Sequence, residues 1–88
     1  MASRTVEMLN RRGLHARASA KFVTLAASQP VDVEVEKDGS CVCGTSIMGL
    51  MMLGAAMGDS ITIRAEGEGA DEAVEALARL VEERFGED

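Results

Sequence analysis

The chain has 88 residues, of which 47% are hydrophobic, and its formal net charge at pH 7 is −6. This length predicts a single domain, residues 1–88, with one modest core, and the hydrophobic content excludes a wholly disordered chain. The negative charge and the near absence of aromatic side chains argue against nucleic-acid binding, and no apolar stretch approaches the roughly 20 residues that cross a membrane. Because the N-terminus is also unlike a signal peptide, we expect a cytoplasmic protein.

The first predicted elements are a strand and a helix. Val6 and Met8 fall on one face of a strand at residues 5–9, and a turn follows at residues 10–13. From residue 16 to about residue 28, apolar side chains recur at helical spacing, and Gln29-Pro30 ends the helix. The apolar side chains at this spacing should form its buried stripe: Ala18, Phe22, Leu25 and Ala26.

A β-hairpin is predicted next. Val31, Val33 and Val35 alternate with acidic residues, Asp38-Gly39 is a typical tight turn, and residues 40–43 form the return strand. Cys41 and Cys43 point the same way along this strand, a spacing unsuited to a disulfide. Two cysteines with a single distant histidine also make a weak metal site, so we expect no metal and no cofactor.

The second half contains a short helix, a strand and a long helix. A helix of about seven residues opens at Gly44-Thr-Ser46 and ends near Gly54, and residues 60–65 form a strand. After Gly69 comes the most amphipathic segment. Its apolar stripe consists of Val74, Leu77, Ala78, Val81 and Phe85. The order β-α-β-β-α-β-α predicts an α+β fold, an open-faced β-sandwich of one four-stranded antiparallel sheet with three helices on one face.

Charge is unevenly distributed along the chain. Up to residue 21 there is one acidic side chain, Glu7, and a cationic group made of Arg4, Arg11, Arg12, Arg17 and Lys21. Beyond Arg64 the chain is strongly acidic. A cationic patch on an anionic protein suggests a site for an anion or an acidic partner, although a solvated face is the simpler explanation.

His15 is the only histidine, and it lies where the loop at residues 10–13 becomes a helix. Amides at a helix start have no partner within the helix and attract anions. Arg12 and Arg17 are close enough in sequence to reach a phosphate beside the imidazole. Phosphoryl transfer requires mainly positioning and charge neutralisation, so a nucleophilic imidazole, a helix start and an arginine would suffice.

Two segments carry a family resemblance. Asn10-Arg-Arg-Gly-Leu-His-Ala-Arg17 resembles the active-site motif of HPr, the histidine-containing phosphocarrier of the bacterial phosphotransferase system, and Gly44-Thr-Ser-Ile-Met-Gly-Leu50 resembles the regulatory-serine segment of that family. The resemblance implies that enzyme I, charged by phosphoenolpyruvate, phosphorylates His15 on Nδ1, and that Arg17 stabilises the phosphate. The group would then pass to a IIA-type acceptor, which makes the chain a carrier and not an enzyme in the strict sense. The family usually has proline where this chain has Ala18, which gives up some stiffness in the first helical turn.

Ser46 has two predicted roles. Its position before Ile47 predicts a helix N-cap. Resemblance to the family adds phosphorylation by HPr kinase/phosphorylase. A phosphate at this helix start need not disturb the fold, but it would weaken the binding of an acidic partner.

The helix after Ser46 is too apolar for a surface helix with one buried side. Leu50 and Leu53 can enter the core, which leaves other large side chains exposed to form an adaptable contact surface. We therefore predict one docking surface for both donor and acceptor on a monomer. Its residues are Arg12, Ala16, Lys21, Ile47, Met48, Met51 and Met52.

Two alternatives remain beside the carrier. One is a regulatory relative, part of an incomplete or nitrogen-linked phosphotransferase system, that acts by binding effector proteins. The other is a ligand-binding α+β module, which would have a pocket and an inert His15.

Overall fold

The computed structural model describes residues 1–87. Its sheet has four strands: β1 (Ala2–Glu7), β2 (Val33–Lys37), β3 (Ser40–Cys43) and β4 (Ser60–Ala65). They lie in the order β1-β4-β2-β3, and every neighbouring pair is antiparallel. The central position of β4 explains its composition, because Ile61, Ile63 and Ala65 are all buried.

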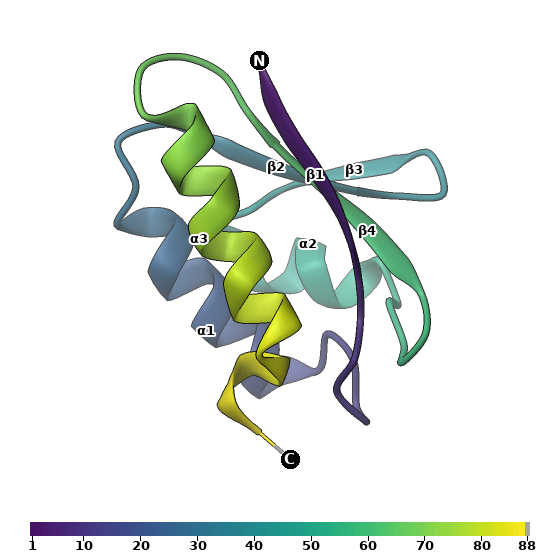
Figure 1. The fold of residues 1–88 in the computed structure, drawn as a ribbon. Helices are drawn as coiled ribbons and strands as arrows, with labels where there is room; N and C mark the ends of the chain where they lie inside the picture. The colour runs from purple at the N-terminus through teal and green to yellow at the C-terminus, as the bar shows by residue number, and fades with distance from the viewer. Residues whose placement is uncertain (88) are drawn as a thin grey trace.

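Three helices cover one face of this sheet (Figure 1). They are α1 (Ala16–Ala27), α2 (Ile47–Met52) and α3 (Ala70–Glu82), followed by the 3-10 turn η1 (Arg84–Gly86). The sequence prediction of an open-faced α+β sandwich is therefore confirmed. The predicted hairpin turn is also confirmed, because Asp38 and Gly39 both have positive φ values, 50° and 86°, as a tight hairpin turn requires.

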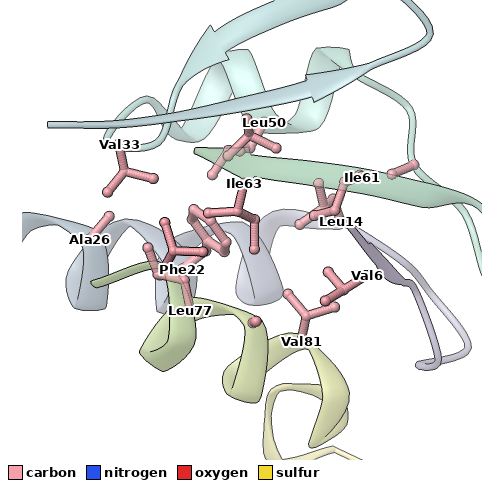
Figure 2. Packing of buried hydrophobic residues seen from close by; sticks show 14 of the residues in the cluster. Val6, Leu14, Phe22, Ala26, Val33, Leu50, Ile61, Ile63, Leu77 and Val81 are labelled. Carbon is pink, nitrogen blue, oxygen red and sulfur yellow. The ribbon is translucent and has the colours of Figure 1, made fainter. Parts of the chain in front are cut away.

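The core lies between the sheet and the helices (Figure 2). Alternate side chains of the strands point into it, and α1 contributes Phe22 while α3 contributes Leu77, both with no exposed surface. The labelled members of the cluster come from strands, helices and the loop before α1: Val6, Leu14, Phe22, Ala26, Val33, Leu50, Ile61, Ile63, Leu77 and Val81. Burial of these aliphatic groups and two Phe supplies the main stabilising force of an otherwise aromatic-poor chain.

The predicted ends of two strands were wrong. β1 covers Ala2–Glu7 and not residues 5–9, because its partner β4 pairs Ala2 with Ala65 and Glu7 with Ser60. β2 begins at Val33, because Val33 is the residue that pairs with Ala65, and Val31 packs beside the core without joining the sheet. Hydrophobic alternation shows which side chains face the core, but only the partner strand decides where the ladder ends.

Two predicted core positions also differ in detail. Phe85 is buried as predicted but lies beyond the end of α3, in η1, with a left-handed backbone (φ 56°, ψ 24°). Leu25 is only half-buried against the core. The turn η1 follows α3 and lies against the N-terminal half of α1, where Lys21 Nζ donates a hydrogen bond to the carbonyl of Phe85 (2.7 Å).

Candidate functional site

The loop before α1 is a tight turn held against the connection between α2 and β4. The amide of Gly13 donates to the carbonyl of Asn10 (3.2 Å), and the amide of Leu14 donates to the carbonyl of Ala55 (2.9 Å). Gly13 has a φ of +60°, and a Cβ at this position would lie 2.1 Å from that same Ala55 oxygen. A residue without a side chain is therefore required here, and the turn fixes where His15 enters the helix.

His15 is the N-cap residue of α1. Its backbone is extended (φ −74°, ψ 179°), and its ring Nδ1 accepts a hydrogen bond from the amide of Arg17 at 3.3 Å. N-cap side chains normally satisfy one of the free amides at a helix start, a task that Ser, Thr, Asp and Asn usually perform. A histidine at this position places a ring nitrogen where the amides and the helix dipole favour negative charge.

The other ring nitrogen of His15 contacts a carboxylate near the C-terminal end of the chain. Nε2 lies 3.1 and 3.0 Å from Oε1 and Oε2 of Glu87, and Asn10 Nδ2 donates to Oε1 at 2.9 Å. The hydrogen bond from Asn10 and, to a smaller extent, the one from His15 lower the pKa of Glu87 below its ordinary value of 4.5. An ionised carboxylate only accepts hydrogen bonds, so Nε2 carries the ring proton and Nδ1 keeps its lone pair.

The lowered pKa of Glu87 links this contact to folding. A carboxyl whose pKa falls on folding stabilises the native state when it is ionised. The contribution is therefore present above the ordinary pKa of 4.5, and it is lost as the pH falls through the lowered value. Glu87 is thus ionised at neutral pH.

Asn10 connects the loop to this carboxylate. It has no exposed surface, and its Nδ2 also donates to the carbonyl of Gly13 at 2.8 Å. Its Oδ1 is buried and has no hydrogen-bond partner in the described part of the chain. The amide group of Asn10 is therefore oriented entirely by its donor contacts, one to the turn and one to Glu87.

The structure places the predicted basic residues around His15 in two ways. Arg12 and Arg17 are exposed, and within residues 1–87 neither guanidinium forms a hydrogen bond or an ion pair. Lys21 is held by the carbonyl of Phe85. Ala16, the first helical residue, is exposed beside His15. The guanidiniums of Arg12 and Arg17 are therefore not engaged within the described chain, whereas the ammonium of Lys21 is.

Ser46 is the N-cap residue of α2, as predicted. Its Oγ accepts a hydrogen bond from the amide of Gly49 at 3.0 Å, and its side chain is half-buried. The helix covers six residues, slightly fewer than expected, and Leu53 is its C-cap residue.

The apolar side chains of α2 divide between core and surface. Leu50 is fully buried and Leu53 packs against the core, as predicted. Met48 and Met52 are 73% and 80% exposed, and Ile47 and Met51 about half as much, 41% and 44%. Met57, which the sequence analysis did not single out, is also exposed. Because Leu14 binds the carbonyl of Ala55, the end of this apolar surface lies beside the loop that carries His15.

Sequence reasoning did not identify Glu87 as part of the site, nor the contact that Asn10 makes with it. Asn10 opens the recognised motif, but its spacing gives no sign of the carboxylate that it binds. Glu87 lies 72 residues from His15, in a run of acidic side chains that all look alike in the sequence. No local pattern could have found this pair.

The described residues offer little support for a metal site, a cysteine-based site or a membrane span. No group of three or more His, Cys, Asp or Glu side chains in residues 1–87 is arranged to hold a metal ion. Cys41 and Cys43 are both exposed and free, and desolvation, followed by the negative charge of Glu34, raises the pKa of the Cys41 thiol. Within the same described residues, no helix has the length and apolar character of a membrane span.

Known proteins resemble this chain over nearly its whole length. The family model described as "PTS HPr component phosphorylation site" matches residues 2–83. The chain belongs to the HPr family. It is 46% identical over 88 residues to the phosphocarrier protein HPr of Pseudomonas aeruginosa, a match that covers 99% of this chain and 98% of that relative. The phosphocarrier protein NPr of Shewanella violacea is 36% identical over 84 residues, which are 96% of this chain and 92% of that one.

The fold comparison agrees with the family assignment. The crystal structure of HPr-C-His from Thermoanaerobacter tengcongensis has a TM-score of 0.94 and 43% identity, with 100% of this chain and 99% of that chain covered. The HPr resemblance that the two sequence motifs carried is therefore confirmed. As an HPr-family member, the chain is a phosphocarrier of the phosphotransferase system.

Proposed function

We propose that Nδ1 of His15 is the atom that receives the phosphoryl group. The observation that carries this proposal is the division of hydrogen bonds on the ring. Nε2 faces the carboxylate of Glu87, and Nδ1 faces a backbone amide at the start of α1. An unprotonated Nδ1 has a lone pair that can attack phosphorus, and the free amides at the start of α1 can bind the phosphate oxygens.

Arg17 and Arg12 are proposed to neutralise the charge of the transferred group. Both residues are exposed and lie within three positions of the N-cap in the sequence, and neither guanidinium has a hydrogen bond or ion pair inside the described chain. Phosphoryl transfer depends mostly on positioning and charge stabilisation, and arginine binds phosphate in a bidentate manner. Arg17 is the stronger candidate, because its own amide already contacts Nδ1.

The proposed donor is enzyme I charged by phosphoenolpyruvate, and the proposed acceptor is a IIA-type protein. In the first step the N–P bond forms at Nδ1 while the bond between phosphorus and the donor breaks, its electron pair staying with the donor. The second step reverses this with the acceptor as nucleophile. The chain ends each cycle unmodified only because another protein discharges it, so it acts as a stoichiometric carrier.

Donor and acceptor are proposed to bind the same docking surface. It consists of basic and small residues around His15 and of the exposed apolar side chains of α2: Arg12, Ala16, Lys21, Ile47, Met48, Met51 and Met52. A basic rim on a chain of net charge −6 favours acidic partners, and methionines adapt to two different surfaces. One copy of the chain carries the whole surface, so we propose a monomeric carrier in the cytoplasm.

Incubation with enzyme I and phosphoenolpyruvate, followed by intact mass measurement, tests the acceptor. We expect the wild-type chain to gain one phosphoryl group that acid releases, as a phosphoramidate bond requires. His15→Ala should gain none. Ser46→Ala should gain the group like wild type, and an acid-stable phosphate on any variant would contradict the proposal.

Met48→Asp tests the docking surface. A carboxylate in place of this exposed methionine adds charge repulsion toward an acidic partner and removes apolar contact. We expect the rate constant for transfer from enzyme I, at limiting concentration, to fall by about tenfold to a hundredfold, as truncation of a central interface residue commonly does. Ser3→Asp, which adds the same charge on the open face of the sheet, should leave that rate unchanged, and equal effects of the two variants would mean that the surface is misplaced.

Ser46 is proposed as a regulatory site for HPr kinase/phosphorylase. Its hydroxyl lies at the start of α2, next to the exposed Ile47, so a phosphate there would put negative charge on the docking surface. The hydrogen bond from Gly49 shows that a backbone amide already points at this position. The modification would therefore weaken binding of an acidic partner while leaving the fold in place.

A regulatory branch is the second candidate function. The similarity to the phosphocarrier protein NPr favours it, because that relative covers almost the entire chain. In this alternative the phosphorylated protein reports metabolic state by binding effector proteins. Genes for sugar-specific membrane permeases next to the gene would favour transport, and their absence would favour regulation.

A further inference from the structure

The C-terminal end of the chain has an unusual backbone. Arg84, Phe85 and Gly86 follow one another with φ values of 59°, 56° and 74°. L residues with a side chain rarely adopt this left-handed conformation, and two of these three carry one. Such strain persists only where the surrounding structure compensates for it, and it occurs often at functional sites.

Several contacts hold this turn. The side chain of Phe85 is 1% exposed within the core, and its carbonyl accepts a hydrogen bond from Lys21 Nζ at 2.7 Å. The amides of Gly86 and Glu87 donate to the carbonyls of Glu83 and Arg84. These contacts hold the turn against α1 and thereby fix the position from which the Glu87 side chain extends.

The carboxylate of Glu87 is also bound by residues of the loop before α1 and of its N-cap. Asn10 Nδ2 donates to it at 2.9 Å, and Asn10 itself is fully buried and tied to the carbonyl of Gly13. Nε2 of His15 lies 3.0 Å from Oε2 of Glu87. Glu87 thus connects the C-terminal turn both to the loop before α1, through Asn10, and to the N-cap of α1, through His15.

Resting on the proposed function, we propose that Glu87 is a positioning residue that holds the ring proton of His15 on Nε2 before and after phosphoryl transfer. When neutral His15 attacks through Nδ1, the N–P bond forms and the ring, which still carries its Nε2 proton, becomes an imidazolium. The ionised carboxylate pairs with this new positive charge without taking the proton, as a triad aspartate does. In onward transfer the N–P bond breaks, its electron pair returns to Nδ1, and a neutral imidazole leaves.

Charged groups around the carboxylate agree with this assignment. Lys21, on α1, is the nearby cation that helps to keep Glu87 ionised together with Asn10 and His15. Arg84, on the same turn, is exposed. Glu83 is an exposed carboxylate just before η1, so it provides a control of equal charge at nearly the same place in the sequence.

The first arm of the test uses the unphosphorylated chain. In proton NMR, an Nε2–H bound to a carboxylate exchanges slowly with water and is visible. We expect this signal in wild type, in Glu83→Gln and in Glu87→Gln, whose amide oxygen still accepts, and its loss in Glu87→Ala. An equally visible signal in Glu87→Ala would overturn the proposal, whatever the chain does with phosphate.

The second arm loads His15 with phosphoramidate, a small phosphoryl donor, and follows loss of the phosphoryl group against pH. Removing an opposite charge at this distance should move the profile toward lower pH by about one unit in Glu87→Gln and in Glu87→Ala, so that loss at pH 8 becomes about tenfold slower. Glu83→Gln should follow the wild-type profile, and a Glu87→Gln profile that coincides with Glu83→Gln would overturn the proposal. Failure of enzyme I to modify His15 would instead contradict the proposed function and leave both arms measurable.

Discussion

Gly13→Ala is expected to destabilise the chain by about 2–4 kcal/mol, the sum of the strain of a left-handed alanine and the loss of a backbone hydrogen bond. The new Cβ would lie 2.1 Å from the carbonyl oxygen of Ala55 and 2.9 Å from the Cα of Ala56. Neither is the end of a flexible side chain, so the loop must move and the hydrogen bond from Leu14 to Ala55 must break. Because this loop sets the position of His15, phosphorylation by enzyme I should also slow by more than the loss of folded protein explains.

Gly54→Ala is the matched control for this prediction. Gly54 also has a positive φ of 65°, but a Cβ there would meet nothing within 4 Å. Gly54→Ala should therefore lower the free energy of unfolding by only about 1 kcal/mol, which is the backbone strain alone. Urea unfolding compares the two variants, and an equal loss of stability would show that the packing of the loop against Ala55 does not matter.

Phe22→Ala is expected to cost about 3–5 kcal/mol in the free energy of unfolding, the usual range for removing a buried aromatic side chain. Phe22, on α1, has no exposed surface, and Figure 2 shows it between Ile63 of the sheet and Leu77 of α3. Domains of this size have only about 5–15 kcal/mol of net stability, so the variant should be close to unfolding at moderate temperature. Its effect on phosphorylation should follow the fraction of folded protein, because Phe22 is a core side chain and is not part of the site around His15.

Val23→Ala provides the comparison for Phe22→Ala. Val23 is the next residue on α1 and is only half-buried against the core. It should cost about 1 kcal/mol, because fewer methyl groups leave a packed environment. Thermal or urea unfolding of both variants would contradict the assignment of the core if Val23→Ala were the more damaging change.

The hydrophobic pattern of the sequence determined the architecture. Alternation in β2 and β4 and the helical stripes of α1 and α3 depend on side-chain periods of 2 and 3.6 residues, which the chain carries locally. The N-cap role of Ser46 and the hairpin turn at Asp38-Gly39 are equally local, because a cap or a turn involves only a few adjacent residues. His15 could be proposed for the same reason: the motif and the helix start that give it meaning lie within eight residues.

Only the tertiary structure decided what completes the site. The ends of β1 and β2 depend on their pairing with β4, and the fate of Phe85 depends on a left-handed turn that no periodicity predicts. The carboxylate that faces Nε2 of His15 belongs to Glu87, which Asn10 also binds, and these contacts span 72 and 77 residues. Acidic side chains near the end of the chain are indistinguishable until the fold brings one of them to the imidazole, since electrostatic contacts depend on distance in space and not along the sequence.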